Sequence, residues 1–292
     1  MRSYPAEYEL VSPGDLAGAL ELLHREPDTW LPVAGGTEVM VQYSAGKLEA
    51  RHLINLWNIA ELRQITETDT SLAIGGGCTF TQLRESPAVQ HHFPLLALAA
   101  SWTGSIANQN RATIAGNIVN ASPAADSPPA LLAYEAELEL ISANGTRKLA
   151  YADFHLGYKK TALLPGELLL AIHLPKRFAD WFRYGQKTGT RNAQAISKVC
   201  IAGVGKLRED RVEAVHIGMG AVAPTPVRLY STEAALCGAV LNDRAIADAR
   251  RILASEIAPI DDIRSSAAYR EHVAANLLED FLRGFAASKD LE

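Results

Sequence analysis

The sequence predicts an α+β protein of two domains, and three observations support this. A chain of 292 residues can bury a substantial core and more often divides into domains than forms one. Strands and helical turns alternate as far as Leu174, where Pro175-Lys176-Arg177 marks a shift in composition. Beyond that point three strands precede three helices, an order typical of an α+β module. We therefore expect domains at residues 1–176 and 177–292.

The chain begins with a helix, followed by short strands that run into glycines. A helix is expected over about 13–25, because Ser12 can cap it and Pro13 suits the first helical position. Its apolar stripe consists of Leu16, Ala19, Leu20 and Leu23. Strands are expected at 30–34, 52–56 and 71–74, with Gly35-Gly36-Thr37-Glu38 after the first and Gly75-Gly76-Gly77 after the third.

Residues 79–129 start as helices and then lose their periodicity. Thr79 and Gln82 form a capping box for a helix to about residue 85, and 93–102 is expected to be a buried helix. From 104 to 129 small and polar residues dominate, over a stretch far longer than the usual connection of about 4–6 residues. Because a loop of this length in a compact domain usually wraps around something, we expect a ligand there.

The rest of the chain has clearer patterns. Strands at 136–142 and 147–150 flank the hairpin turn Asn144-Gly145, and 167–174 is a further strand. The second domain is expected to contain strands at 181–187, 197–207 and 211–218, and helices at 232–237, 243–256 and 267–286.

Composition excludes several classes of function. A net charge of −5 argues against an extended nucleic-acid surface. The 3 cysteines have no C-x-x-C spacing, so neither a disulfide framework nor a self-contained metal or iron-sulfur site is encoded. The first residues, Met1-Arg2-Ser3-Tyr4-Pro5, lack the apolar h-region of a signal peptide, and no apolar run approaches the roughly 20 residues of a membrane span. We expect a cytoplasmic protein without membrane insertion.

Two segments of the first domain suit a phosphate-containing ligand. At Gly35-Gly36-Thr37-Glu38 backbone N–H groups can approach an anion, and Thr37 adds a hydroxyl. A plain tight turn explains the glycine pair alone, and a surface loop explains the long segment alone. Together they favour a nucleotide, whose ribose or phosphate oxygens could be met by Thr113, Asn117, Ser122 and Asp126.

Motifs for hydrolysis are missing. The sequence contains no G-x-S-x-G and no H-E-x-x-H, and its histidines have no metal-ligand spacing. We therefore assign no catalytic residue and no metal ligand, and expect the chemistry to come from a cofactor.

Several motifs, taken in order, resemble one family. They are Ala34-Gly35-Gly36-Thr37-Glu38, Leu53-Ile54-Asn55, Ala112-Thr113-Ile114-Ala115-Gly116-Asn117, Ala121-Ser122-Pro123-Ala124-Ala125-Asp126, Val222-Ala223-Pro224-Thr225-Pro226 with Arg228, and Asp262-Ile263-Arg264 with Tyr269-Arg270. The chain is similar to the medium, FAD-binding subunit of molybdenum hydroxylases, the xanthine dehydrogenase and carbon monoxide dehydrogenase group. The resemblance implies a two-lobed FAD domain of the vanillyl-alcohol-oxidase (PCMH) type, followed by the flavoprotein C-terminal domain.

The resemblance also implies which residues bind FAD. Gly35 to Glu38 would hold one side of the pyrophosphate, Thr113 to Ser122 the other side, and Asp126 the ribose or ribityl region. The full set implied is Val33, Ala34, Gly35, Gly36, Thr37, Glu38, Trp102, Thr113, Ala115, Gly116, Asn117, Ser122, Asp126, Leu169 and Lys187.

The implied activity is electron transfer. FAD, bound non-covalently, would pass electrons to NAD or another acceptor, while a [2Fe-2S] small subunit and a molybdopterin large subunit would carry the other centres. A docking surface for these partners is expected around Trp102, Asn108, Gln109 and Lys187.

Three positions depart from the family pattern. Ala115 stands where a second glycine is usual, Asn108-Gln109-Asn110 where Ile-Arg-Asn is common, and Ala195 where Asp is frequent. Two rival interpretations remain: a stand-alone flavin oxidase of the same domain type, and an assembly module that has lost flavin.

Overall fold

The N-terminal lobe is a small parallel sheet with two helices. The structure, a computed structural model, describes residues 4–191 and 194–288. The lobe consists of β1 (Glu9–Val11), α1 (Leu16–Arg25), β2 (Trp30–Val33), α2 (Val39–Ser44) and β3 (His52–Asn55). Its strands pair in the order β1-β3-β2, all parallel. Because β2 ends at Val33, the Gly35–Glu38 turn emerges at one edge of the lobe, directly before α2.

A five-stranded antiparallel sheet forms the middle of the molecule. Its order is β4 (Ile65–Glu67), β5 (Ser71–Gly75), β10 (Leu168–Pro175), β6 (Glu137–Ser142) and β7 (Gly145–Ala150). The helices beside it are α3 (Phe80–Glu85), α4 (Pro87–His92), α5 (Pro94–Trp102), α6 (Ile106–Gln109), α7 (Ile114–Val119) and α8 (Pro128–Ala133). A small hairpin is formed by β8 (His155–Gly157) and β9 (Lys160–Thr161), and short 3₁₀ helices lie at Pro5–Glu7, Ala60–Arg63, Tyr151–Asp153 and Lys176–Phe178.

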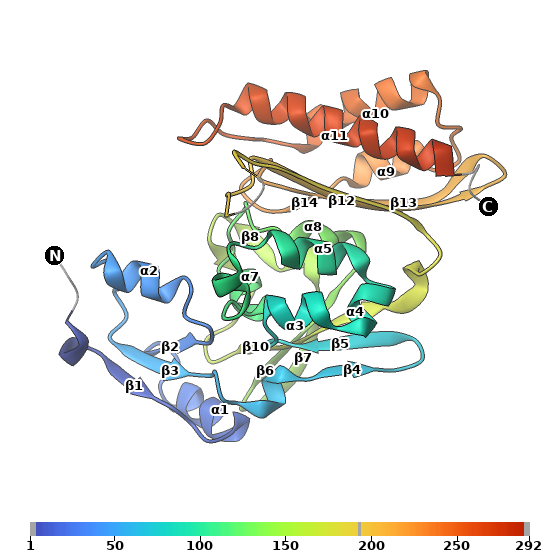
Figure 1. Cartoon of the computed structure of the whole chain (residues 1–292). Helices are drawn as coiled ribbons and strands as arrows, with labels where there is room; N and C mark the ends of the chain where they lie inside the picture. The colour runs from blue at the N-terminus through green and yellow to red at the C-terminus, as the bar shows by residue number, and fades with distance from the viewer. Residues whose placement is uncertain (1–3, 192–193, 289–292) are drawn as a thin grey trace.

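The C-terminal part is a second antiparallel sheet covered by helices. The strands are β11 (Phe182–Thr188), β12 (Val199–Arg208), β13 (Arg211–Gly220) and β14 (Val227–Arg228), paired in that order. The helices are α9 (Tyr230–Leu236), α10 (Asp243–Glu256) and α11 (Ala267–Ala287). Figure 1 shows this sheet between α5 and α8 on one side and α10 and α11 on the other. The predicted α+β class is confirmed.

Glycines let the C-terminal sheet pack closely against the helices on its two faces. A Cβ on Gly218 would lie 2.3 Å from the carbonyl oxygen of Pro129 in α8, and one on Gly205 would lie 2.4 Å from the ring of Phe285 in α11. The sheet is therefore packed tightly on both faces, with Phe281 and Phe285 stacked in the C-terminal core.

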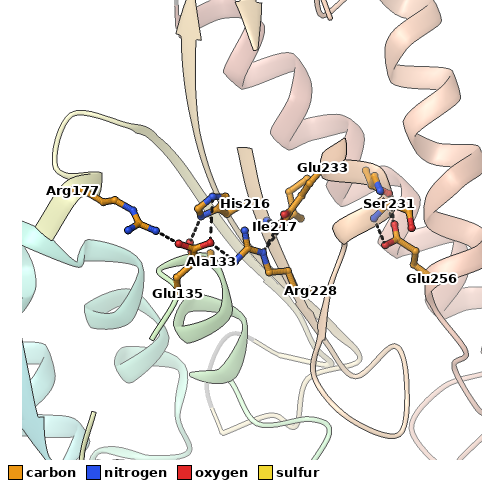
Figure 2. Close-up of polar contacts among 10 residues, drawn as sticks. Ala133, Glu135, Arg177, His216, Ile217, Arg228, Ser231, Glu233 and Glu256 are labelled. Atoms are coloured by element: carbon orange, nitrogen blue, oxygen red, sulfur yellow. Dashed lines mark hydrogen bonds and ion pairs between the residues drawn. The ribbon is translucent and has the colours of Figure 1, made fainter. Parts of the chain in front are cut away.

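A partly buried ion network also ties the region after α8 to the C-terminal part (Figure 2). Glu135, directly after α8, accepts hydrogen bonds from Arg177 and, at 2.8 Å, from Arg228. Arg228 in turn donates to Glu233, which also accepts from the amide of Ile217 at 2.7 Å. The Nδ1–H of His216 donates to the carbonyl of Ala133 at 3.0 Å. These contacts connect α8 to β13, β14 and α9.

Two sequence expectations were wrong. The first helix begins at Leu16, not at Pro13, because its N-cap is Asp15, whose carboxylate accepts from the amide of Gly18 at 2.8 Å. The segment 104–129 is not a plain loop, since it contains α6, α7 and the start of α8. Ser105 and Thr113 cap α6 and α7 with their hydroxyls, so these helices need no apolar stripe to begin.

Candidate cofactor-binding site

A cleft of about 1190 Å³ lies where the three parts of the chain meet. One wall is the turn after β2, the second is the segment from Thr103 to Asp126, and the third comes from the C-terminal part. The volume exceeds that of most drug-sized pockets, which span about 300–1,000 Å³. Among residues 4–191 and 194–288, no group of three or more His, Cys, Asp and Glu side chains could hold a metal ion. The cleft therefore suits a large organic ligand.

The turn after β2 offers unpaired amides to the cleft. No described residue accepts a hydrogen bond from the N–H groups of Gly35, Gly36, Thr37 or Glu38, and all four residues line the cleft. Gly36 has a φ of +75°, a backbone conformation that residues with a side chain rarely adopt. Because successive free N–H groups form a concave site for an anion, this turn suits a phosphate.

The second wall is rigid and polar. The Thr113 hydroxyl caps α7 by accepting from the amide of Gly116 at 3.2 Å. The Asn117 side-chain oxygen accepts from Ser127 at 2.7 Å, so the NH₂ group of its amide is left for a ligand. A Cβ on Gly35 would lie only 1.7 Å from the carbonyl oxygen of Arg111, so the first wall packs directly against the segment that forms the second.

Asp126 lies at the floor of the cleft in a buried ion pair. Its Oδ2 accepts from Lys187 at 2.7 Å and its Oδ1 accepts from Ser197 at 2.6 Å. Lys187 also donates to the carbonyl of Trp102 at 3.0 Å. Burial raises the pKa of the Asp126 carboxyl, and the Lys187 ammonium and Ser197 hydroxyl act in the opposite direction. The pair joins the first domain to β11.

Most of the predicted cofactor-binding residues are brought together here. Those that line the cleft are Val33, Ala34, Gly35, Gly36, Thr37, Glu38, Thr113, Gly116, Asn117, Ser122 and Asp126. Trp102, Ala115, Leu169 and Lys187 are not among the lining residues. Leu169 is buried in the core, and the Ala115 Cβ fills space opposite Gly76, where an added Cβ would be 2.9 Å away.

The predicted docking surface is wrong in part. Asn108 is exposed, but Gln109 is buried, donates to the carbonyl of Ser101 at 3.0 Å and accepts from Arg84 at 2.8 Å. The Lys187 side chain is also buried, against Asp126. Neither residue is available to a partner chain, because hydrogen bonds to residues 8 to 85 positions away, which sequence spacing does not reveal, hold both side chains inward.

The third wall was not predicted. Ser197, Ala223, Asp262 and Arg264 line the cleft from the C-terminal part. The motifs that contain Ala223 and Asp262-Ile263-Arg264 carried the family resemblance, but nothing in their sequence assigned them to the cleft. Arg270 anchors this wall: it is 4% exposed and donates to the carbonyls of Lys198 and Ala221 and to Asp262.

Asp262 is held as an anion at this wall. Burial alone would raise its pKa, but the amides of Arg264 and Ser265 and the guanidinium groups of Arg264 and Arg270 lower the pKa to about 2. The third wall therefore brings a carboxylate, that of Asp262, and two guanidinium groups, those of Arg264 and Arg270, to the cleft.

The geometry fits a dinucleotide. Free amides at Gly35 to Glu38 can meet a pyrophosphate, and the hydroxyls and amides of Thr113 to Ser122 lie on the opposite wall. Fold and site together define a two-domain protein with a cleft suited to a dinucleotide. The family model described as "FAD binding domain in molybdopterin dehydrogenase" matches residues 6–177, and "CO dehydrogenase flavoprotein C-terminal domain" matches 186–285.

Similar proteins extend over nearly the whole chain. The xanthine dehydrogenase FAD-binding subunit of Escherichia coli O157:H7 is 35% identical over 260 residues, covering 88% of this chain and 89% of its own. The carbon monoxide dehydrogenase medium chain of Hydrogenophaga pseudoflava is 28% identical, covering 94% and 96%. A solved structure of carbon monoxide dehydrogenase from that organism superposes with a TM-score of 0.92 over 97% of this chain and 99% of its own, at 28% identity.

The chain belongs to the xanthine dehydrogenase and carbon monoxide dehydrogenase family of molybdenum hydroxylases, as an FAD-binding medium subunit. It is thus an oxidoreductase subunit, and the predicted family, cofactor and enzyme class are confirmed. In the part of the chain that the structure describes, no helix is long and apolar enough to cross a membrane.

Proposed function

We propose that this chain is the electron-transferring subunit of a molybdenum hydroxylase complex and holds FAD non-covalently in the cleft. The observation that carries the proposal is the set of unpaired amides at Gly35 to Glu38, facing the polar segment 113–126 across one cleft. FAD, when bound, supplies one- and two-electron chemistry, so the chain receives electrons from an iron-sulfur cluster and delivers them to NAD or another acceptor.

The chain's own groups bind and orient the cofactor. The amides of Gly35, Gly36, Thr37 and Glu38 hold one side of the pyrophosphate, after Val33 and Ala34 have positioned the turn. Thr113, Gly116, Asn117 and Ser122 would meet the other side, and Ala115, whose amide donates to the carbonyl of Gly76 at 3.0 Å, would support this wall from behind. Asp126 accepts a hydrogen bond from a ribose or ribityl hydroxyl, because a carboxylate has lone pairs beyond those that Lys187 and Ser197 use. Trp102, Leu169 and Lys187 support the flavin end from behind the cleft lining.

Partner chains carry the remaining centres, a [2Fe-2S] small subunit and a molybdopterin large subunit. The relatives support this, because they bear names such as glyceraldehyde dehydrogenase medium chain and nicotine 6-hydroxylase medium subunit. The cysteines support it too: Cys78 and Cys200 are buried thiols within the described core, and Cys237 stands apart from them. We also place the complex in the cytoplasm, where free thiols are usual.

The domain boundary at 176/177 is part of the same proposal. It is supported by the family matches, one of which ends at residue 177 while the other begins at 186. The five-stranded sheet also ends at Pro175, and β11 begins at Phe182.

A visible absorption spectrum of the purified chain tests the cofactor. We expect flavin absorbance, and release of the cofactor as FAD on denaturation, because two polar walls offer more anion contacts than a single phosphate needs. Release of FMN, or flavin that stays with the denatured chain, would contradict the proposal.

Co-expression with neighbouring reading frames tests the complex. We expect the chain to elute from size exclusion together with an iron-sulfur protein and a molybdopterin protein. If it elutes alone in their presence and oxidises small molecules by itself, it is a stand-alone flavin oxidase instead.

A further inference from the structure

Ser197 occupies an unusual place between the two domains. Its side chain is fully buried, it lines the cleft, and its hydroxyl donates to Asp126 Oδ1 at 2.6 Å. Ser197 lies just before β12, whereas Asp126 belongs to the first domain. The hydrogen bond therefore reaches across the cleft floor from one part of the chain to the other.

Asp126 is held by residues at both ends of the connection between β11 and β12. Lys187 lies near the end of β11 and Ser197 just before β12, and the amide of Lys198 donates to the carbonyl of Thr188 at 2.8 Å. The connection between these strands thus closes next to Asp126. One end supplies a cation to Oδ2 and the other end supplies a neutral hydroxyl to Oδ1. The carboxylate can neither rotate nor turn away without breaking one of these contacts.

The charges around Asp126 make the hydroxyl important. Lys187 is the cation that faces it, and the buried Cys200 thiol lies on the β12 side. Burial raises the pKa of the Cys200 thiol to about 12, with the charge of Asp126 contributing, so this thiol stays neutral. A hydroxyl that donates to a carboxylate favours its charged form. Ser197 therefore acts with Lys187 against the burial that favours protonation of Asp126.

We propose that Ser197 is a positioning residue that fixes the Asp126 carboxylate, as an anion, toward the FAD cleft. This inference rests on the proposed function, since it assumes that FAD binds beside Asp126. It has a second consequence: loss of the hydroxyl shifts the protonation of Asp126 to higher pH, so FAD affinity is lost at a less acidic pH.

The test is the FAD dissociation constant of the full-length apoprotein from pH 5 to pH 8, measured by flavin fluorescence. For Ser197→Ala we expect roughly tenfold weaker binding near pH 6, because a carboxylate oxygen loses its buried partner. The acid limb of the binding curve, the pH range in which FAD affinity falls as the pH is lowered, should move to higher pH. Ser197→Thr keeps the hydroxyl and should restore both the affinity and the pH profile.

A matched control is available in the C-terminal part. Thr232 is also fully buried, and its hydroxyl donates to the carboxylate of Glu256 at 2.6 Å. Thr232 does not line the cleft. Figure 2 shows Glu256 beside Ser231, the neighbour of Thr232. Thr232→Val removes an equivalent hydrogen bond. We expect this variant to lose stability while keeping the FAD affinity and pH profile of the unmodified chain.

A double variant separates positioning from general damage. In Asp126→Asn the side chain cannot titrate, so adding Ser197→Ala should no longer move the acid limb. If Ser197→Ala does not fold, Ser197→Cys, a weaker donor of similar size, should shift the limb in the same direction. An unchanged affinity and profile in the Ala or Cys variant would overturn the role of Ser197 while leaving the proposed function intact. Failure of the unmodified chain to bind FAD would instead overturn the proposed function.

Discussion

Gly35 and Gly36 are neighbours, but the structure requires glycine at each for a different reason. At Gly35 the backbone of Arg111 comes so close that even a methyl group would collide with its carbonyl. At Gly36 there is space, since the nearest atom to an added Cβ is 3.6 Å away on Met40, but φ is +75°. One glycine therefore joins the two walls of the cleft, and the other lets the chain turn so that its amides are free.

Gly36→Val should lower FAD content severely while the C-terminal domain stays folded. A branched side chain at positive φ costs about 1–2 kcal/mol and crowds the place where phosphate approaches. Gly238 is a matched control, because it has a φ of +78° and open space around it but does not line the cleft. Flavin absorbance per chain should fall only in the Gly36 variant. A fully yellow Gly36→Val would mean that the pyrophosphate binds elsewhere.

Lys187→Met should destabilise the chain by about 3–5 kcal/mol, because it leaves the buried Asp126 carboxylate without its cation. The comparison is Lys148→Met, which breaks a pair with Glu137 on the surface, where both side chains are about half exposed, and should change stability little. Urea unfolding of both variants measures the difference. Equal losses would show that burial does not strengthen the Asp126 pair.

At the scale of elements, the short helices around the cleft depend on their caps. The capping box predicted at α3 is confirmed: Thr79 accepts from the amide of Gln82 at 3.2 Å, and Gln82 accepts from the amide of Thr79 at 2.9 Å. Thr79 also pairs through its backbone with Thr113, the cap of α7. Two helix starts are thereby fixed to each other, so the second wall of the cleft rests on α3.

Thr79→Ala should lower the free energy of unfolding by about 1 kcal/mol and weaken FAD binding, whereas Thr79→Ser should restore both. Ser266 is the control, because its hydroxyl caps α11 by accepting from the amide of Tyr269 at 3.2 Å, away from the cleft lining. Ser266→Ala should lose similar stability without losing FAD. If both variants keep their flavin affinity, α3 does not support the second wall.

At the scale of the whole molecule, two partly buried histidines make stability depend on pH. Burial lowers the pKa of His216 to about 4, with the charges of Arg228 and Arg177 acting in the same direction. Burial also lowers the pKa of His155 to about 4. An unfolded histidine titrates near 6.5, so between about pH 6.5 and pH 4 the unfolded chain binds more protons than the folded one. Stability is therefore greatest above pH 6.5 and is lost as the pH falls through this window.

Urea unfolding at pH 7.5, 6 and 4.5 should show this loss, and His216→Gln and His155→Gln should each make the dependence shallower. His24→Gln is the control variant, because His24 is exposed on α1. His216 lies between α8 and β13, where it donates to the carbonyl of Ala133. In His216→Gln the stability of this interface should therefore also depend less steeply on pH. A dependence that is unchanged in both His216→Gln and His155→Gln would show that other groups titrate on unfolding.

The sequence by itself determined whatever depends on neighbouring residues. The α+β class, the capping box at α3 and the turn after β2 follow from residues a few positions apart, and the family follows from motifs read in order. The helices α6 and α7 escaped prediction, since helices of 4 and 6 residues are too short to display a period.

Only the tertiary structure decided which side chains meet. Asp126 was predicted as a ligand of the cofactor alone, yet its partners Lys187 and Ser197 are 61 and 71 residues away. Gly35 was attributed to phosphate approach, but it also packs against Arg111, and the motifs of the third wall carried the family resemblance without being assigned to the cleft. The physical reason is that local patterns fix the conformation of a segment, whereas contacts between distant segments depend on how the two sheets and α8 pack against each other.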